Sequence, residues 1–145
     1  MLNAGEGGFH PRLSGFSNLE YFAVFYDIPL REARSRIRRL MTLLGLDDRG
    51  LDQYQTYSSG MRRRLALARA MLPDPPVLLL DEPTIGIDPW STEQIHNHLR
   101  DLSKGGKTIL CTTNSRAEAN VLGGHTYLLE KGSLSGQEMG EIKAA

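Results

Sequence analysis

Several features that mark particular classes of protein are missing from this 145-residue sequence. No apolar run approaches the roughly 20 residues of a membrane-spanning helix, and the N-terminus lacks the basic-then-apolar pattern of a secretory signal. Neither charge is in excess, because 17 basic residues balance 17 acidic ones. A polyanion would therefore feel no long-range attraction, so we predict a cytoplasmic protein without a nucleic-acid partner.

Disulfides and metal-binding histidines are also missing. Cys111 is the single cysteine, so no disulfide can form within the sequence, and its place in a strand-like run indicates a buried, inert thiol. No histidine has a metal-ligand spacing to a cysteine or an acidic residue, and we assign no chemistry to any of the four: His10, His96, His98 and His125.

What is present centres on an aliphatic run, residues 77–80, that two carboxylates follow directly. The run is typical of a strand buried on both faces of a parallel sheet, and α/β proteins bind ligands at the carboxyl ends of such strands. Asp81 offers the oxygen ligand that Mg²⁺ prefers, and Glu82 is suited to orient or deprotonate a water that attacks a γ-phosphate. The run alone is equally typical of a buried strand that ends in an acidic turn.

Two helices are predicted before this strand. Ser14 is a cap for a helix whose apolar positions run to Tyr26. Pro29 suits the first turn of a second helix that Gly45 ends. The apolar face of the second helix comprises Leu30, Ala33, Ile37, Leu40, Met41 and Leu44. Its opposite face carries Arg31, Arg34 and Arg38, which we interpret as solvated, with a docking surface as the alternative.

A third helix begins at a pair of serines. Ser58 and Ser59 precede Gly60 and a stretch rich in arginine, alanine and leucine. Their hydroxyls and the free backbone N–H groups form either an ordinary helix cap or an anion site. Asp88 and Pro89 give a second cap signal, at the start of a helix that follows the acidic pair.

The remaining elements alternate in type. Strand-like runs at residues 107–112 and 127–129 flank a short helix, and Ser115 with Glu118 has the capping-box pattern at its start. The order strand, helix, strand, helix, strand predicts a parallel sheet with right-handed crossovers, and hence an α/β fold.

In this order the motifs resemble those of one family, the ATP-binding cassette ATPases of ABC transporters. Residues 57–61, Tyr-Ser-Ser-Gly-Met, are similar to the family's Leu-Ser-Gly-Gly-Gln signature. Residues 77–83 resemble the Walker B strand with its catalytic glutamate, and residues 86–89 resemble the D-loop. The resemblance extends over residues 9–134 and is greatest to cassettes that serve exporters of the ABC-2 type.

The resemblance implies the C-terminal half of a RecA-like P-loop NTPase core with parallel strands, joined to the helical subdomain of these cassettes. It implies three parts: a remnant of the Q-loop region at residues 1–11, the helical subdomain at 12–72 and the core half at 73–145. ATP and Mg²⁺ are the implied cofactors, with Asp81 as the Mg²⁺ site and Glu82 as the general base.

The same resemblance implies partners. Cassettes of this family sandwich two ATP molecules head to tail, so Ser58, Ser59 and Gly60 would clamp the γ-phosphate of a nucleotide held by a second cassette. Asp88 would make a contact across that dimer. The assembly would dock on a membrane permease at the inner face of the cell membrane and energise transport.

The sequence also departs from the family pattern. It contains no Walker A loop, so we expect a fragment that binds nucleotide poorly by itself. Gly5 stands near the Q-loop glutamine position, and Asn114 stands at the switch histidine position, where an amide can hydrogen-bond a γ-phosphate but cannot carry a positive charge. These departures leave open a non-hydrolysing regulatory or structural module. A DNA-repair cassette has less support, because long coiled-coil or zinc-binding insertions are absent.

Two further stretches imitate family motifs. Residues 106–108 have the Gly-Lys-Thr end of a P-loop but lead from a helix into a strand. Residues 134–137 read Leu-Ser-Gly-Gln, but no alanine-rich helix follows them. We interpret both as loops.

Overall fold

The structure is a computed structural model that describes residues 8–137. The chain divides into two compact units, Met1–Thr112 and Thr113–Ala145, and each is described by itself. Most of the predicted Q-loop remnant, including Gly5, lies outside the described residues. The predicted division of the chain at residues 11/12 and 72/73 stays a prediction.

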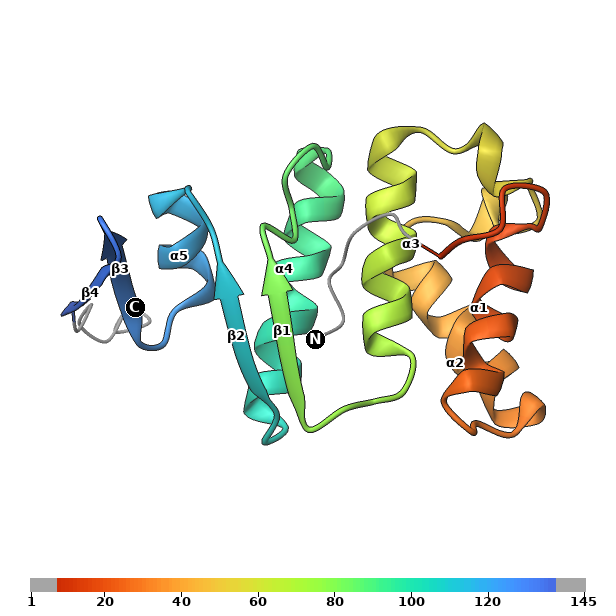
Figure 1. Ribbon diagram of the computed structural model, residues 1–145, viewed down its shortest axis with the longest axis horizontal. Helices are drawn as coiled ribbons and strands as arrows, with labels where there is room; N and C mark the ends of the chain where they lie inside the picture. The colour runs from red at the N-terminus through yellow and green to blue at the C-terminus, as the bar shows by residue number, and fades with distance from the viewer. Residues whose placement is uncertain (1–7, 138–145) are drawn as a thin grey trace. The chain divides into compact units, whose positions relative to one another are not determined.

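A cluster of three helices forms one part of the first unit (Figure 1). It consists of α1 (Gly15–Phe25), α2 (Leu30–Leu43) and α3 (Ser59–Met71), with the short 3-10 helices η1 (Asp47–Arg49) and η2 (Tyr54–Thr56) between α2 and α3. Its core contains fully buried leucine and isoleucine side chains from the three helices and from the residues that follow α2 and α3: Leu19, Ile37, Leu44, Leu46, Leu65 and Leu72.

The predicted caps of this cluster are confirmed. Ser14 Oγ accepts a hydrogen bond from the backbone N–H of Ser17 at 3.0 Å, and Ser58 Oγ accepts one from Met61 N–H at 3.2 Å. Pro29 occupies the N-cap of α2, one position earlier than predicted. The arginine face of α2 is exposed, as the solvated interpretation requires.

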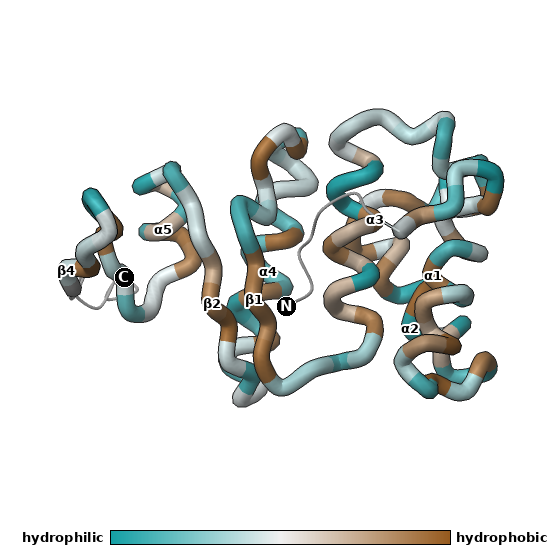
Figure 2. Tube along the Cα trace, viewed as in Figure 1, coloured by the Kyte–Doolittle hydropathy of each residue, from teal (hydrophilic) through white to brown (hydrophobic). Residues whose placement is uncertain are grey.

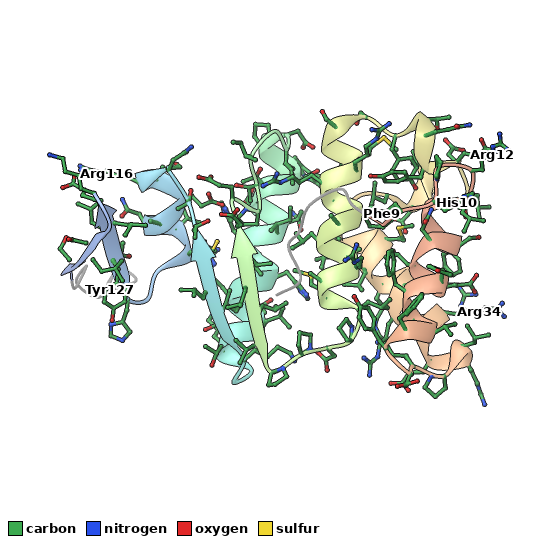
Figure 3. The ribbon with its side chains drawn as sticks, in the orientation of Figure 1. Phe9, His10, Arg12, Arg34, Arg116 and Tyr127 are labelled. Atoms are coloured by element: carbon green, nitrogen blue, oxygen red, sulfur yellow. The ribbon has the colours of Figure 1, made fainter. Side chains whose placement is uncertain are left out.

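The segment before α1 is held to the cluster through Phe9 (Figure 3). The Phe9 ring stacks on Tyr54 with centroids 4.9 Å apart and meets Phe22 edge-on at 5.3 Å. The Arg69 guanidinium of α3 lies 4.3 Å from the centroid of Phe22 and 5.6 Å from that of Phe9. Cations at such distances from an aromatic face are attracted to it, so this contact joins α3 to the first described residues.

The second part of the first unit is a βαβ element (Figure 1). Strand β1 (Val77–Asp81) pairs in parallel with β2 (Thr108–Thr112), and α4 (Pro89–Lys104) connects them. Asp81 is the register partner of Thr112, so both strands end at the same edge of the sheet. Asp88 caps α4 with Pro89 in its first turn, and Gly105 ends it, as predicted.

The prediction that β1 is buried on both faces is wrong. Leu78 and Leu80 are buried, but 51% of Val77 and 48% of Leu79 are exposed, and Leu110 of β2 is 61% exposed. Figure 2 shows apolar residues along both strands. Successive side chains of a strand point to opposite faces, and among the described residues only one face of this sheet is covered. Cys111 is correspondingly half-buried.

The second unit contains α5 (Arg116–Leu122), β3 (Thr126–Glu130) and β4 (Ser133–Gln137). The prediction that residues 127–129 extend the parallel sheet is wrong, because β3 pairs with β4 in an antiparallel hairpin. The interpretation of residues 134–137 as a loop is wrong for the same reason. Lys131 and Gly132, with φ of 48° and 81°, form the two-residue turn that returns the chain antiparallel.

Among the helices within residues 8–137, none combines the length and apolar character needed to cross a bilayer.

Candidate functional site

The two predicted site carboxylates lie where β1 ends beside β2. Thr112 Oγ1 donates a hydrogen bond to Asp81 Oδ1 at 2.5 Å, and the backbone N–H of Glu82 donates to Thr112 O at 3.1 Å. The Asp81 side chain is exposed at this edge. The strand ends therefore hold a carboxylate at the position where α/β folds bind their ligands.

Glu82 has an unusual backbone conformation. Its φ is 47°, in the left-handed region that residues other than glycine seldom adopt. Ile85 N–H donates to Glu82 O at 3.3 Å, so the chain turns sharply as it leaves the strand. Strain of this kind persists only where the surroundings hold it, and it is concentrated at functional sites.

The start of α3 exposes its polar groups. Ser58 and Ser59 are exposed, and Ser58 Oγ caps the Met61 N–H while other first-turn N–H groups lack a helical partner. A Cβ on Gly60 would lie 3.1 Å from the carbonyl oxygen of Gly86. The first turn of α3 therefore packs against the turn between β1 and α4, and a side chain at position 60 would crowd that backbone.

Asp88 is fixed as the cap of α4. Its Oδ1 accepts from Ser91 N–H at 2.9 Å, and Arg64 Nη1 lies 3.9 Å from its Oδ2. The hydrogen bond from Ser91 N–H, with the Ser91 hydroxyl and the Arg64 charge adding to it, holds the pKa of Asp88 below its ordinary value. Asp88 is exposed and ionised at neutral pH, so it presents a negative charge at the helix start.

Asn114 belongs to the second unit, apart from the other predicted site residues in sequence and in unit. It is exposed and stands just before Ser115, whose hydroxyl accepts from Glu118 N–H at 3.3 Å and caps α5. The Glu118 carboxylate accepts from the Thr113 hydroxyl at 2.6 Å. These hydrogen bonds therefore hold Thr113 and Ser115, the two neighbours of Asn114, against α5.

A chelating cluster of protein side chains is not part of this arrangement. Among residues 8–137, no group of three or more histidine, cysteine, aspartate and glutamate residues could hold a metal ion.

A model of the family described as ABC transporter matches residues 4–85. The chain belongs to the ABC transporter family. Relatives in this family include the daunorubicin resistance ATP-binding protein DrrA3 of Streptomyces coeruleorubidus, 39% identical over 120 residues, which are 83% of this chain and 38% of that protein. The Nod factor export ATP-binding protein I of Cupriavidus metallidurans is 37% identical over 122 residues, 84% of this chain and 40% of that protein. The chain thus spans well under half the length of these relatives.

Solved structures of ABC proteins share the fold. The ATP-binding subunit of an ABC transporter matches 91% of this chain and 55% of its own with a TM-score of 0.82 and 22% identity. A dimeric post-hydrolysis state of an ATP-binding cassette bound to ADP and Pi matches 93% of this chain and 60% of its own chain, with a TM-score of 0.81 and 24% identity. The predicted α/β fold is confirmed.

Within this ABC chain, two arginines that the sequence motifs did not single out connect the signature helix α3 to other elements: Arg63 to the end of β1, and Arg64 to the first turn of α4. Arg63 Nη2 donates to Asp81 O at 3.0 Å and also to Glu82 O. Arg64 Nη1 donates to Ser91 Oγ at 3.0 Å and to Leu44 O at 3.2 Å. The run of three arginines was the available signal, but a helix sequence does not tell which guanidinium turns toward another element.

Proposed function

We propose that this chain is part of the ATP-binding subunit of an ABC transporter, which binds and hydrolyses ATP at a dimer interface. The observation that carries the proposal is the joint placement of Asp81 and Glu82 at the end of β1, beside the first turn of α3. A separate membrane permease would then hold the subunit at the inner face of the cell membrane. The names of the relatives, which refer to resistance and export, support this assignment.

Asp81 is the proposed Mg²⁺ residue. One of its oxygens accepts from Thr112, and within residues 8–137 no hydrogen bond reaches the other, Oδ2. Mg²⁺ keeps several waters and is commonly held through one or two carboxylates and the nucleotide's phosphates, so a single open carboxylate oxygen fits it. Bound there, the ion would neutralise charge on the phosphates.

Glu82 is the proposed general base. It follows Asp81 directly, and no hydrogen bond from residues 8–137 reaches its carboxylate, which leaves both oxygens available to a water. A carboxylate that accepts the proton of the attacking water, or orients that water, is the role that phosphoryl transfer requires. Asn114 is proposed as the switch-position residue from its place in the sequence.

The opposing nucleotide would be bound by the start of α3. Ser58, Ser59 and Gly60 combine exposed hydroxyls with free N–H groups at the positive end of a helix dipole, which suits a γ-phosphate. Asp88 would contact the second cassette across the dimer. A solved structure with the same fold is a dimeric cassette bound to ADP and Pi, which supports a dimer, and the head-to-tail arrangement is the one that the family resemblance implies.

A non-hydrolysing module is the second candidate. Asparagine at position 114 favours it, because an amide cannot supply the charge of a protonated histidine. The sequence as given also contains no Walker A motif, whose amides and lysine hold the β- and γ-phosphates. We therefore expect the 145-residue chain alone to hydrolyse ATP no faster than its Glu82→Gln variant.

The decisive experiment mixes the chain with a cassette that carries Walker A and measures ATP-dependent association by light scattering. Ser58→Arg should abolish association, because a long cationic side chain fills the phosphate position. Ser103→Arg, at the exposed end of α4, is the matched control and should associate normally. Association that survives Ser58→Arg overturns the assignment. A version of the chain joined to a Walker A segment that associates with ATP but shows no Glu82-dependent hydrolysis favours the second candidate.

A further inference from the structure

Arg63 links two parts of the first unit that carry different proposed roles. It lies one turn into α3, close behind Ser58 and Gly60, and its guanidinium reaches the end of β1. Nη2 donates to the carbonyl oxygen of Asp81 at 3.0 Å and to that of Glu82. A single nitrogen on the signature helix is therefore bonded to two successive carbonyls of the Walker B segment.

The two accepting carbonyls belong to the two peptide groups that flank the Glu82 Cα. The Asp81 carbonyl is part of the peptide before it, and the Glu82 carbonyl is part of the peptide after it. Fixing both peptide planes fixes φ and ψ of Glu82, because these torsions are the rotations between those planes. The direction of the Cα–Cβ bond, and with it the reach of the carboxylate, is set by the same contact.

The contact acts on a conformation that needs support. Glu82 has a φ of 47° and precedes Pro83, which further limits its backbone freedom. Hydrogen bonds from a charged donor are stronger than those between neutral groups, so a guanidinium is an effective clamp. Arg63 Nε is buried and has no hydrogen-bond partner within residues 8–137, so in this part of the chain the guanidinium bonds to the Walker B carbonyls alone.

We propose that Arg63 is a positioning residue that couples the signature helix to Glu82 of the same chain. A displacement of the first turn of α3, as when Ser58, Ser59 and Gly60 close on a nucleotide, moves the guanidinium and reorients the peptides around Glu82. In a head-to-tail dimer these are parts of two different nucleotide sites, so Arg63 conveys the occupancy of one site to the base of the other. The regulatory half of this inference rests on the proposed function, whereas the clamp on Glu82 does not.

The kinetic test uses a hydrolysing cassette made by joining the Walker A segment of a relative to this chain. Arg63→Met should lower kcat about tenfold and leave KM within about twofold, since the loss falls on the base and not on ATP binding. Arg63→Lys, which keeps the charge but not the planar fork, should recover part of the loss. Arg36→Met is the matched control: Arg36 Nη1 also donates to a carbonyl, that of Leu72 at 3.1 Å, far along α3 from Ser58.

Equal kcat for Arg63→Met and the parent overturns the inference, and so does an equal loss in Arg36→Met, which would indicate a general effect on folding. A second readout is independent of hydrolysis. In the 145-residue chain without nucleotide, amide hydrogen exchange at residues 82 and 84–86 should rise at least fivefold in Arg63→Met, with no change in α1 or α2. Arg36→Met should leave these amides unchanged.

The two readouts separate the two hypotheses. A joined cassette without Glu82-dependent turnover contradicts the proposed function, while the exchange measurement still decides whether Arg63 holds Glu82. Unchanged exchange at residues 82 and 84–86 in Arg63→Met overturns the clamp itself.

Discussion

The hydroxyl of Thr112 contacts both Asp81 and Glu82: it donates to Asp81 Oδ1 at 2.5 Å and accepts from the Glu82 N–H at 3.2 Å. One side chain of β2 thus orders the carboxylate of one candidate residue and the backbone of the other. Because the Thr112 main chain also accepts from Glu82 N–H, the whole exit of β1 depends on this residue.

Thr112→Val should lower the free energy of unfolding by about 0.5–1.5 kcal/mol, the usual net value of a hydrogen bond. Valine keeps the shape and the strand preference of threonine, so the change isolates the hydroxyl. Urea denaturation measures the effect. Thr108→Val, at the exposed start of the same strand, is the control and should change stability by less than about 0.5 kcal/mol. Equal stability of the two variants would contradict the role of the hydroxyl.

Gly15→Ala should destabilise the helical cluster by about 1–3 kcal/mol, as overpacking of a filled site does. A Cβ there would lie 2.1 Å from the Tyr57 hydroxyl oxygen and 2.9 Å from its ring carbon Cζ. Tyr57 would have to move and lose its hydrogen bond to Arg49 O, which is 2.8 Å long. The loss should appear as a lower urea midpoint.

Gly50→Ala is the control for this change. Gly50 has φ of −59° and ψ of −29°, and a Cβ there would make only ordinary contacts, the nearest at 3.4 Å. An alanine at a compatible position stabilises a protein by about 0.4–1 kcal/mol through the unfolded chain. The two substitutions should therefore have opposite signs, and a stabilising Gly15→Ala would contradict the packing described for Tyr57.

Stability should fall at high pH through Tyr57. Burial, with the Asp52 carboxylate adding to it, raises the pKa of Tyr57 from 10.0 to about 12. A raised folded-state pKa means that the neutral phenol stabilises the fold fully below pH 10.0, and that this contribution is lost as the pH rises toward about 12. Urea denaturation between these two pH values measures the loss of stability, and tyrosinate absorbance follows the ionisation of the phenol. The stability of the Tyr57→Phe variant should decline less steeply with pH than that of the parent. Equally steep declines would assign the effect to other titrating groups.

Asn114→His should raise the turnover of the joined cassette about threefold or more. A protonated histidine makes a charge-assisted bond worth about 1.5–3 kcal/mol, against about 0.5–1.5 for a neutral one, and each 1.36 kcal/mol is tenfold in rate. Asn114→Ala should lower turnover if the amide acts as a weakened sensor. Steady-state ATPase assays compare the three. Equal rates would leave Asn114 as a loop residue without a role in hydrolysis.

Much of the local structure and the family were predictable from the sequence. The caps at Ser14, Ser58, Asp88 and Ser115 all form, because a cap depends on a side chain and on N–H groups only two or three residues away. The order of signature, Walker B and D-loop stretches likewise needs no spatial information to be recognised. These features determined the α/β fold and the choice of Asp81 and Glu82.

The tertiary structure decided which faces are covered and which residues distant in the sequence come into contact. An aliphatic run has the same sequence whether one face or both faces of its strand are covered, so the exposure of Val77 and Leu79 could not be predicted. The pairing of β3 with β4 depended on a two-residue turn at Lys131 and Gly132 and not on the alternation of elements. The reach of Arg63 to the carbonyls of Asp81 and Glu82 joins residues 18 and 19 positions apart, and only the packing of α3 beside β1 brings them together.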